Sequence, residues 1–347
     1  MSSSLSSKNK SFTVAKTGHK YAYVHHPPSN PSKPTLLLLH GFPSTSYDWR
    51  HQIPFLTSLG YGVIVPDLLG YGSSSKPLDV EPYIGQSMAA DMISVLDHEG
   101  INSVVGVGHD WGTYLLTHLI LWYPERVERC VFVSVAFHVP GRKMDVQALN
   151  EMTRKAVGYE ALGYWMFFTA PGSGKVIGDN WETFFNIIYC ADASLWEKHF
   201  APLGAMEKDL RDMTPEASSK LLASWICDED KATHHAEFGT DYTPALNWYR
   251  RGFSSLGSNI EVSALANNSI SPKIHVPTLM ITGTKDIVCI HGRPTNTMEG
   301  CVEEGRLEVK DIEAGHWVML EKTAEFNKVL KEWLEDTEGK VGEKAGL

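Results

Sequence analysis

Short, unbroken apolar runs alternate with stretches of helical periodicity in two separate parts of the chain. The apolar runs, which predict buried strands, lie at residues 35–39, 62–65, 103–107, 130–136 and 278–282. Apolar residues with the spacing of one helix face follow the first three runs, at residues 47–59, 87–98 and 113–123. This alternation predicts a mostly parallel central sheet flanked by helices. Further short strands are predicted at residues 12–14, 21–25 and 306–309.

The alternation stops between residues 138 and 268, where helical stretches rich in aromatic residues replace it. Five of the ten tryptophans fall in this segment: Trp165, Trp181, Trp196, Trp225 and Trp248. A helical insertion between two strands of a parallel sheet is typical of a lid over the sheet edge. The predicted organisation is a disordered tail at 1–10, a core formed by 11–137 and 269–337, a helical lid at 138–268 and a flexible tail at 338–347.

The sequence Gly108-His109-Asp110-Trp111-Gly112 joins one predicted strand to the helix that follows it. A strand, a sharp turn and a helix, with glycine two positions before and after the central residue, form the nucleophile-elbow pattern. Cβ atoms at the glycine positions would clash with the neighbouring strand and helix. The alternatives are a structural glycine-rich turn and a dinucleotide-binding loop, but the glycine spacing is one residue too long for that loop.

Aspartate at the centre of the elbow indicates attack on a saturated carbon. A serine that attacked such a carbon would leave an ether, which water does not cleave. A carboxylate leaves an ester, which water opens at its carbonyl carbon. Asp110 is therefore predicted to displace a leaving group at an sp³ carbon, for which oxiranes and alkyl halides are the obvious electrophiles.

Candidate partners for this aspartate follow other predicted strands. Asp286 comes after the strand at 278–282, and His316 comes after the strand at 306–309, which gives the chain order nucleophile, acid, histidine of α/β hydrolases. His40-Gly41-Phe42-Pro43 follows the strand at 35–39, so its backbone N–H groups are expected at the carboxyl edge of the sheet. Alone, each of these residues has an ordinary structural explanation. Together, in this order on one edge, they predict a catalytic triad.

Composition and charge exclude several function classes. The formal net charge of −10 argues against a nucleic-acid or anionic-membrane partner, and Arg250-Arg251 is interpreted as solvated surface. The five cysteines are scattered without a C-x-x-C pair, which favours reduced thiols, and no ligand cluster calls for a metal or an organic cofactor. Without a membrane span or a signal sequence, a cytoplasmic location is predicted, as a monomer or a homodimer.

These motifs jointly resemble a known family. His40-Gly41-Phe42-Pro43, Gly108-His109-Asp110-Trp111-Gly112, Asp286 and Gly315-His316-Trp317 look like the soluble epoxide hydrolases of the α/β-hydrolase superfamily, and the likeness covers the chain from about Phe12 to Leu334. The resemblance implies the α/β-hydrolase fold with an inserted helical lid. It also implies that an epoxide is converted to a vicinal diol through an ester on Asp110, without a cofactor.

The lid carries two further parts of the resemblance. Asn247-Trp248-Tyr249-Arg250 looks like the family's lid motif, whose tyrosine hydrogen-bonds the oxirane oxygen, and the segment from Tyr164 to Pro171-Gly172 is similar to the one with the second lid tyrosine. Tyr159 and Tyr189 are alternatives for that second position. The resemblance further implies an oxyanion hole formed by the backbone N–H groups of Phe42 and Trp111, and a substrate-binding surface of Phe42, Trp111, Tyr164, Trp165 and Tyr249.

Two other functions stay open at this point. Haloalkane and haloacid dehalogenases share the aspartate elbow, but Phe42 occupies the position of their halide-binding asparagine and Trp111 occupies the position where haloacid enzymes need arginine. A departing alkoxide needs a proton donor, which two tyrosines supply and which a halide does not require. The other alternative is a non-catalytic ligand receptor on the same fold. The expected partners are a small apolar or aryl epoxide and water.

Overall fold

The computed structural model describes residues 7–290 and 292–338, and its centre is an eight-stranded sheet with the order β1-β2-β4-β3-β5-β6-β7-β8. The strands are β1 (Lys10–Thr13), β2 (Lys20–His26), β3 (Thr35–Leu39), β4 (Gly62–Pro66), β5 (Val104–His109), β6 (Val127–Val133), β7 (Thr278–Gly283) and β8 (Leu307–Ile312). β2 pairs antiparallel with β1 and β4, and all pairs from β4 to β8 are parallel. The predicted mostly parallel sheet is confirmed.

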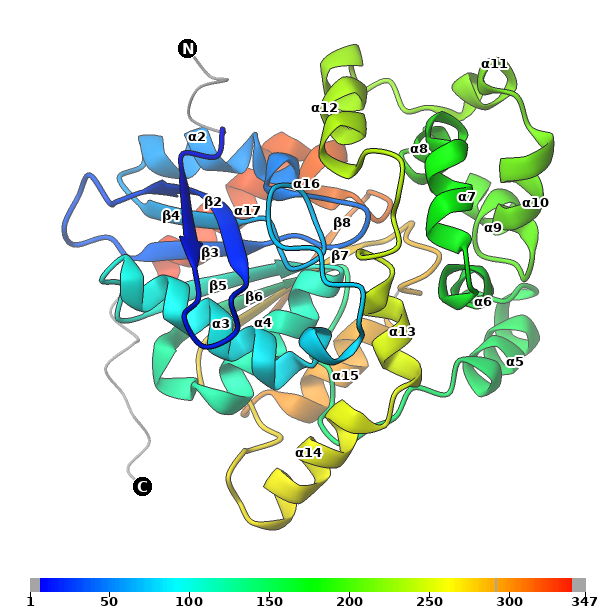
Figure 1. Ribbon diagram of the computed structural model, residues 1–347. Helices are drawn as coiled ribbons and strands as arrows, with labels where there is room; N and C mark the ends of the chain where they lie inside the picture. The colour runs from blue at the N-terminus through cyan, green and yellow to red at the C-terminus, as the bar shows by residue number, and fades with distance from the viewer. Residues whose placement is uncertain (1–6, 291, 339–347) are drawn as a thin grey trace.

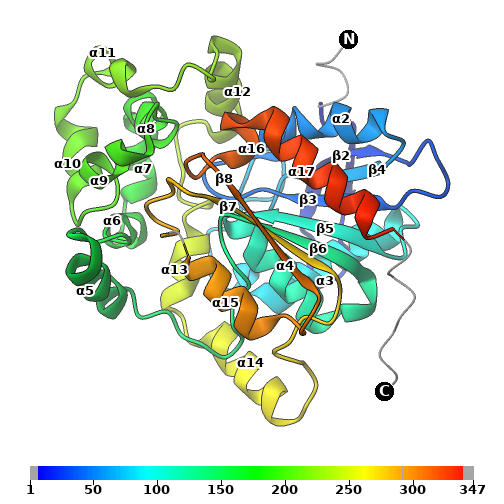
Figure 2. The ribbon, with the colours of Figure 1, turned by 180° about the vertical axis from the view of Figure 1, so that it is seen from behind.

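Helices cover both faces of this sheet, which is why its central strands are apolar throughout. Every residue of β3, β4, β5 and β7 is buried. In Figures 1 and 2, α2 and α17 lie on one face, and α3 and α4 lie on the other. The helices of this part are η1 (Ser46–Trp49), α2 (Gln52–Ser58), η2 (Glu81–Tyr83), α3 (Gly85–His98), α4 (Trp111–Trp122), η3 (Pro124–Arg126), α15 (Arg293–Cys301), α16 (Val318–Glu321) and α17 (Thr323–Asp336).

The segment between β6 and β7 is helical and extends to one side of the sheet, on the right in Figure 1. Its helices are α5 (Val146–Val157), α6 (Tyr164–Thr169), α7 (Ser173–Asp179), α8 (Trp181–Ile188), η4 (Ala193–Leu195), α9 (Trp196–His199), α10 (Ala205–Asp212), α11 (Pro215–Ser218), η5 (Ser219–Leu221), α12 (Asp228–Phe238), α13 (Asn247–Phe253) and α14 (Leu256–Ala266). The predicted bounds of the lid, residues 138–268, stay predictions. Among residues 7–290 and 292–338, each helix is too short or too polar to span a bilayer.

The helix predicted at 47–59 is divided into η1 and α2. Thr45 accepts a hydrogen bond from the backbone N–H of Tyr47 and so starts the first short turn. Pro54 lacks the N–H that a continuous helix would use at that position, whereas near the start of a separate helix this N–H is not needed. The strand predicted at 130–136 is also shifted, because β6 ends at Val133 and Ser134 adopts a φ of 63°.

The tail predicted at residues 1–10 is too long. The backbone N–H of Asn9 donates to the carbonyl of Tyr23, and Lys10 already begins β1. Lys8 lies 3.0 Å from the buried carboxylate of Asp67 and also pairs with Glu237. The residues at this end are polar and are attached through main-chain hydrogen bonds and ion pairs. The sequence therefore has no apolar pattern here that would predict an ordered segment. Residues 1–6 and 339–347 lie outside the described residues.

The approach of α4 to β3 leaves no room for a side chain at Gly112. A Cβ atom on this residue would lie 2.2 Å from the carbonyl oxygen of Leu39, which is backbone and does not rotate away. We expect Gly112→Ala to lower the free energy of unfolding by about 1–3 kcal/mol or more, measured by denaturant unfolding. Gly300→Ala is the matched control, because a Cβ there meets no atom within 4 Å. Equal stability of both variants would contradict this account of the elbow.

Candidate active site

Asp110 lies at the junction of β5 and α4, in a backbone conformation that few residues adopt. Its φ is 50° and its ψ is −121°, outside the usual regions for a residue with a side chain. Two close approaches enforce this conformation. A Cβ on Gly108 would lie 2.7 Å from the carbonyl oxygen of Gly112, and a Cβ on Gly41 would lie 2.2 Å from Oδ1 of Asp110. The carboxylate is thereby held against the loop that follows β3.

That loop supplies a hydrogen bond to the carboxylate. The backbone N–H of Phe42 donates to Oδ1 of Asp110 at 2.8 Å. Trp111 begins α4, so its backbone N–H is one of the four at a helix start that have no acceptor within the helix. Of the two N–H groups predicted as an oxyanion hole, that of Phe42 contacts the carboxylate and that of Trp111 is free of a helical acceptor, and the oxyanion hole itself stays a prediction.

His316 and Asp286 meet as the chain order of the motifs predicts. Nδ1 of His316 lies 2.7 Å from Oδ2 of Asp286. The second oxygen of Asp286 accepts hydrogen bonds from the backbone N–H groups of Val288 and Cys289, each at 3.0 Å. Because these bonds fix the carboxylate, they also fix the ring plane of His316 and keep the proton on Nδ1. Nε2 is left facing the nucleophile.

The contact between His316 and Asp110 sets the charge state of both groups. Nε2 of His316 lies 3.7 Å from Oδ2 of Asp110, whose side chain is 17% exposed. Burial alone would lower the pKa of His316, but Asp286 and Asp110 outweigh it and raise this pKa well above its usual value. Burial would raise the pKa of Asp110, but His316 and the N–H of Phe42 lower it. The resting site therefore contains an imidazolium between two carboxylates.

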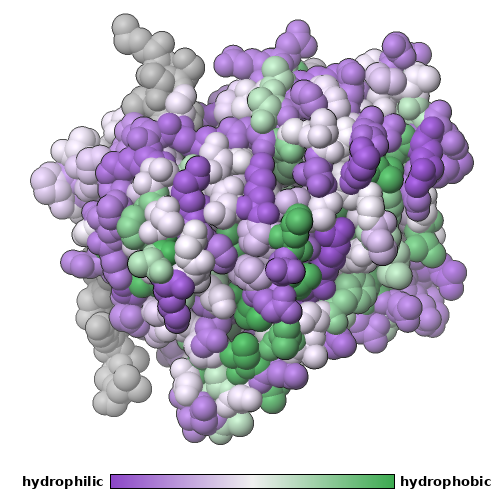
Figure 3. Space-filling view, viewed as in Figure 1, coloured by the Kyte–Doolittle hydropathy of each residue, from purple (hydrophilic) through white to green (hydrophobic). Residues whose placement is uncertain are grey.

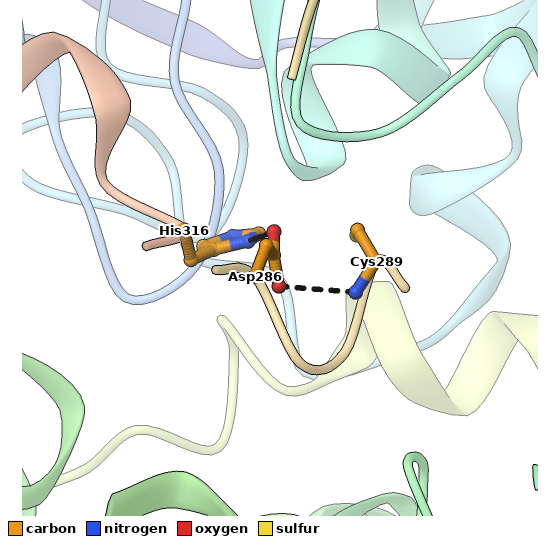
Figure 4. Close-up of side chains that lie close together, drawn as sticks. All are labelled: Asp286, Cys289 and His316. Carbon is orange, nitrogen blue, oxygen red and sulfur yellow. Dashed lines mark hydrogen bonds and ion pairs between the residues drawn. The ribbon is translucent and has the colours of Figure 1, made fainter. Parts of the chain in front are cut away.

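Cys289 completes a cluster with Asp286 and His316, shown in Figure 4. One ligand atom from each residue lies within 4.8 Å of the others, a donor set of the kind that zinc binds. The cluster is poorly suited to a metal, because both oxygens of Asp286 already accept hydrogen bonds from His316 and from the backbone. Burial also raises the pKa of the Cys289 thiol to about 12, so the thiolate ligand is disfavoured.

The two predicted lid tyrosines lie close together above this carboxylate. Tyr249 on α13 is 4% exposed, and its ring centre lies 5.2 Å from that of Phe42 and 5.1 Å from that of Trp111. Tyr164 on α6 is 8% exposed, with its ring centre 6.0 Å from that of Tyr249. Burial, and the nearby charge of Asp110, raise the pKa of both phenols well above the usual value. Both remain protonated, so both are hydrogen-bond donors.

The alternatives for the second tyrosine have other hydrogen bonds. The hydroxyl of Tyr189 donates at 3.0 Å to the carbonyl of Pro43 and lies 3.1 Å from Asp48. The hydroxyl of Tyr159 donates to the carbonyl of Ile287. Since no such bond to a carbonyl or carboxylate is formed by the Tyr164 hydroxyl within the described residues, the geometry favours Tyr164.

Neighbours of Tyr249 in the lid motif, together with Trp165, hold α13 in position. The indole N–H of Trp248 donates to the carbonyl of Leu69 at 2.8 Å, and the side-chain amide of Asn247 donates to the carbonyls of Leu78 and neighbouring residues. Trp165 packs against Tyr249 at 5.1 Å between ring centres. These contacts join the lid helix to the loop after β4. In the sequence, Asn247 and Trp248 stand out only as the neighbours of Tyr249 in the lid motif, and their hydrogen bonds to the loop after β4 could not be predicted.

Comparison with known proteins agrees with this geometry. Residues 34–185 match the family model described as the α/β hydrolase fold. Epoxide hydrolase A of Mycobacterium tuberculosis is 34% identical over 88% of this chain and 91% of its own length. The chain belongs to the epoxide hydrolase family. A solved structure of epoxide hydrolase A from Mycobacterium thermoresistibile is 28% identical and covers 94% of this chain and 98% of its own, with a TM-score of 0.71.

The relation to the mammalian members of the family is partial. Bifunctional epoxide hydrolase 2 of Sus scrofa is 31% identical over 88% of this chain. The match includes only 52% of the pig protein, so the chain spans about half the length of that relative.

The location predicted for Arg251 is wrong. Arg250-Arg251 was expected on the solvated surface. Instead, Arg250 donates to the carbonyl of Thr243, and the guanidinium carbon of Arg251 lies 4.7 Å from the ring centre of Trp111. The same carbon lies 3.1 Å from the ring centre of Tyr114. Tyr249 and Arg251 lie in the same turn of α13. This turn therefore places Tyr249 near Asp110 and Arg251 on the rings of Trp111 and Tyr114.

The charge balance of the site predicts how His316 responds when Asp110 loses its charge. In an Asp110→Asn variant, only one of the two neighbouring carboxylates remains, so we expect the pKa of His316 to fall. NMR titration of the His316 ring measures this pKa directly. Asp209→Asn is the control, because that carboxylate pairs with His199 at 2.7 Å and not with His316. The same His316 pKa in both variants would refute the coupling.

Proposed function

We propose that this chain hydrolyses epoxides to vicinal diols through a covalent ester on Asp110, with a small apolar or aryl epoxide as substrate. The observation that carries the proposal is a nucleophile elbow with aspartate, Asp110, lying beneath two buried and protonated phenols, Tyr164 and Tyr249. An oxirane needs both parts, because its ring opening requires a nucleophile at carbon and a proton donor at oxygen.

Ring opening uses the two carboxylate oxygens differently. Oδ1 of Asp110 accepts the hydrogen bond from Phe42, which leaves Oδ2 as the attacking atom. As Oδ2 bonds to one ring carbon, the carbon–oxygen bond of the oxirane breaks and its electron pair goes to the oxygen. Hydrogen bonds from Tyr164 and Tyr249 stabilise this oxygen as its charge develops, and a phenol proton or a solvent proton completes the hydroxyl. The product is a hydroxyalkyl ester.

Formation of the ester also prepares the base for the second step. The ester carries no charge, so the imidazolium of His316 loses one of its two anionic neighbours and its pKa falls. The imidazolium gives its Nε2 proton to solvent. Nε2 of the neutral ring then accepts a proton from a water that attacks the carbonyl carbon of Asp110, while Asp286 stabilises the ring cation that forms. The oxyanion develops on Oδ1, next to the N–H groups of Phe42 and Trp111. Collapse releases the diol and restores the carboxylate.

Dehalogenation is the second candidate function, because the same aspartate would also displace a halide. The paired phenols favour the epoxide, since a halide leaves without protonation. A receptor without activity has no use for the coupled charges of Asp110, His316 and Asp286. The cytoplasmic location and the monomeric or homodimeric state stay predictions from the sequence.

The two-step scheme predicts that His316→Gln traps the ester. Without a base, water no longer attacks the ester at a useful rate, whereas the nucleophile remains intact. Intact-mass measurement after mixing this variant with styrene oxide should show one added molecule of substrate per chain. The Asp110→Ala variant, treated in the same way, should show none. An unmodified His316→Gln protein would count heavily against the scheme, and bromide release from 1-bromobutane by the unaltered chain would favour dehalogenation.

A further inference from the structure

A cavity of about 580 Å³ adjoins the proposed catalytic groups without containing Asp110. Trp111 and Trp165 form its wall on the side of the nucleophile. Its other walls come from the connection after β6, the start of α5, α13, α14 and α15, which lie close together in the lower part of Figures 1 and 2. It is therefore bounded by both the sheet domain and the helical insert.

The side chains around this cavity are apolar in part and otherwise mainly basic. Apolar members include Ile84, Phe137, Met144, Leu149 and Met152. In Figure 3, apolar residues also gather over α14, where Leu256 and Val262 are exposed. The positively charged side chains around the cavity are Arg142, Lys143, Arg251 and Arg293, and the negatively charged ones are Asp145 and Glu261. An excess of positive charge at one cavity is unexpected in a protein with a net charge of −10.

Arg251 is the least exposed of these cations, and among the described residues no acidic side chain is hydrogen-bonded to it. Within residues 7–290 and 292–338, its guanidinium forms no hydrogen bond or ion pair, and its Nε is buried without a partner. Glu261 is the acidic residue that acts on the pKa of Arg251. Its oxygens already have other hydrogen-bond partners: Oε1 lies 2.8 Å from Nε2 of His118, and Oε2 accepts a hydrogen bond from the N–H of Gly141. The remaining contacts of Arg251 are the faces of Trp111 and Tyr114.

A partly buried guanidinium without a hydrogen-bond acceptor is costly, because contacts with aromatic faces replace only part of its lost hydration. Burial also lowers the pKa of Arg251, because the loss of hydration disfavours the charged form. Such a group is stabilised when an anion enters the cavity and forms the missing hydrogen bonds. A carboxylate fits the planar guanidinium well, since its two oxygens accept two parallel N–H bonds.

The position of Arg251 connects this anion site to the epoxide. Its guanidinium carbon lies 4.7 Å from the ring centre of Trp111, and that centre lies 5.1 Å from the ring centre of Tyr249. Trp111 thus contacts both the cation and the phenol proposed to bind the oxirane oxygen. An oxirane held by Tyr249 and an anion held by Arg251 would therefore be neighbours of the same indole.

We propose that the preferred substrates are epoxides that carry a carboxylate a short spacer away from the oxirane, and that Arg251 binds this carboxylate. The inference rests on the proposed epoxide hydrolysis and adds its substrate class. The exposed cations Arg142, Lys143 and Arg293 lie around the same cavity, so they attract such anions before binding. Trp111 stands in the sequence where haloacid enzymes need arginine, and α13 places Arg251 on the ring of this tryptophan.

The test compares styrene oxide bearing a para carboxylate with its own methyl ester, which has the same oxirane and ring but no charge. The readout is the ratio of kcat/KM for the acid to kcat/KM for the ester, so that any general effect of a substitution on packing cancels. We expect the unaltered enzyme to favour the acid. Arg251→Met should lower this ratio by about tenfold to hundredfold, the usual effect of losing a charged hydrogen bond.

Two further variants separate a specific contact from total charge. Arg251→Lys should keep part of the preference, because it retains the cation and loses the two-pronged geometry. Arg154→Met also removes one positive charge, but Arg154 is 61% exposed and does not line the cavity, so the ratio should stay as in the unaltered enzyme. In the unaltered enzyme, added salt should lower the ratio, a measurement that does not depend on any variant folding.

The outcomes distinguish the two proposals. The carboxylate site is wrong if the oxirane of the methyl ester is opened to a diol as efficiently as that of the acid, or if Arg251→Met leaves the ratio unchanged. In either case epoxide hydrolysis stands. If neither compound nor styrene oxide itself yields a diol, the proposed function is wrong and the substrate class fails with it. A ratio that falls equally in Arg251→Met and Arg154→Met would assign the effect to net charge and overturn the specific contact.

Discussion

The structure depends most on the close approach between the start of α4 and the end of β3. Gly112 lies against the carbonyl of Leu39, and Gly41 lies against the Asp110 carboxylate, in both cases without room for a Cβ atom. At this contact Asp110 has a positive φ, and its Oδ1 accepts a hydrogen bond from the N–H of Phe42. The close approach that requires the two glycines therefore occurs where the proposed nucleophile meets the first N–H of the proposed oxyanion hole.

Around this fixed carboxylate, the site is organised by charge. His316 lies between Asp110 and Asp286, and its pKa is raised because it has an anion on each side. The same arrangement explains why one histidine suits both steps: it is a cation while the nucleophile is charged and becomes a base once alkylation removes that charge. Arg251 contacts the ring of Trp111, next to this group, and takes no part in the proposed mechanism.

Much of the fold and the site was predictable because the relevant signals are local. Buried parallel strands are apolar throughout, and the glycines at 108 and 112 are needed whatever the rest of the chain does. Other features depend on tertiary contacts. Arg250-Arg251 has the composition of a surface, yet α13 turns Arg251 onto the ring of Trp111. The attachment of Lys8 and the hydrogen bond of Tyr189 to Pro43 likewise depend on partners distant in sequence.

The central claim is that Asp110, and not water, attacks the epoxide. Single-turnover hydrolysis of styrene oxide in ¹⁸O-labelled water, with unlabelled protein in excess, tests it most directly. If Oδ2 of Asp110 attacks, the first diol carries unlabelled oxygen from the carboxylate, and the labelled atom from water remains on Asp110, where peptide mass detects it. A labelled diol together with an unlabelled Asp110 would contradict the account, because water would then have opened the ring itself.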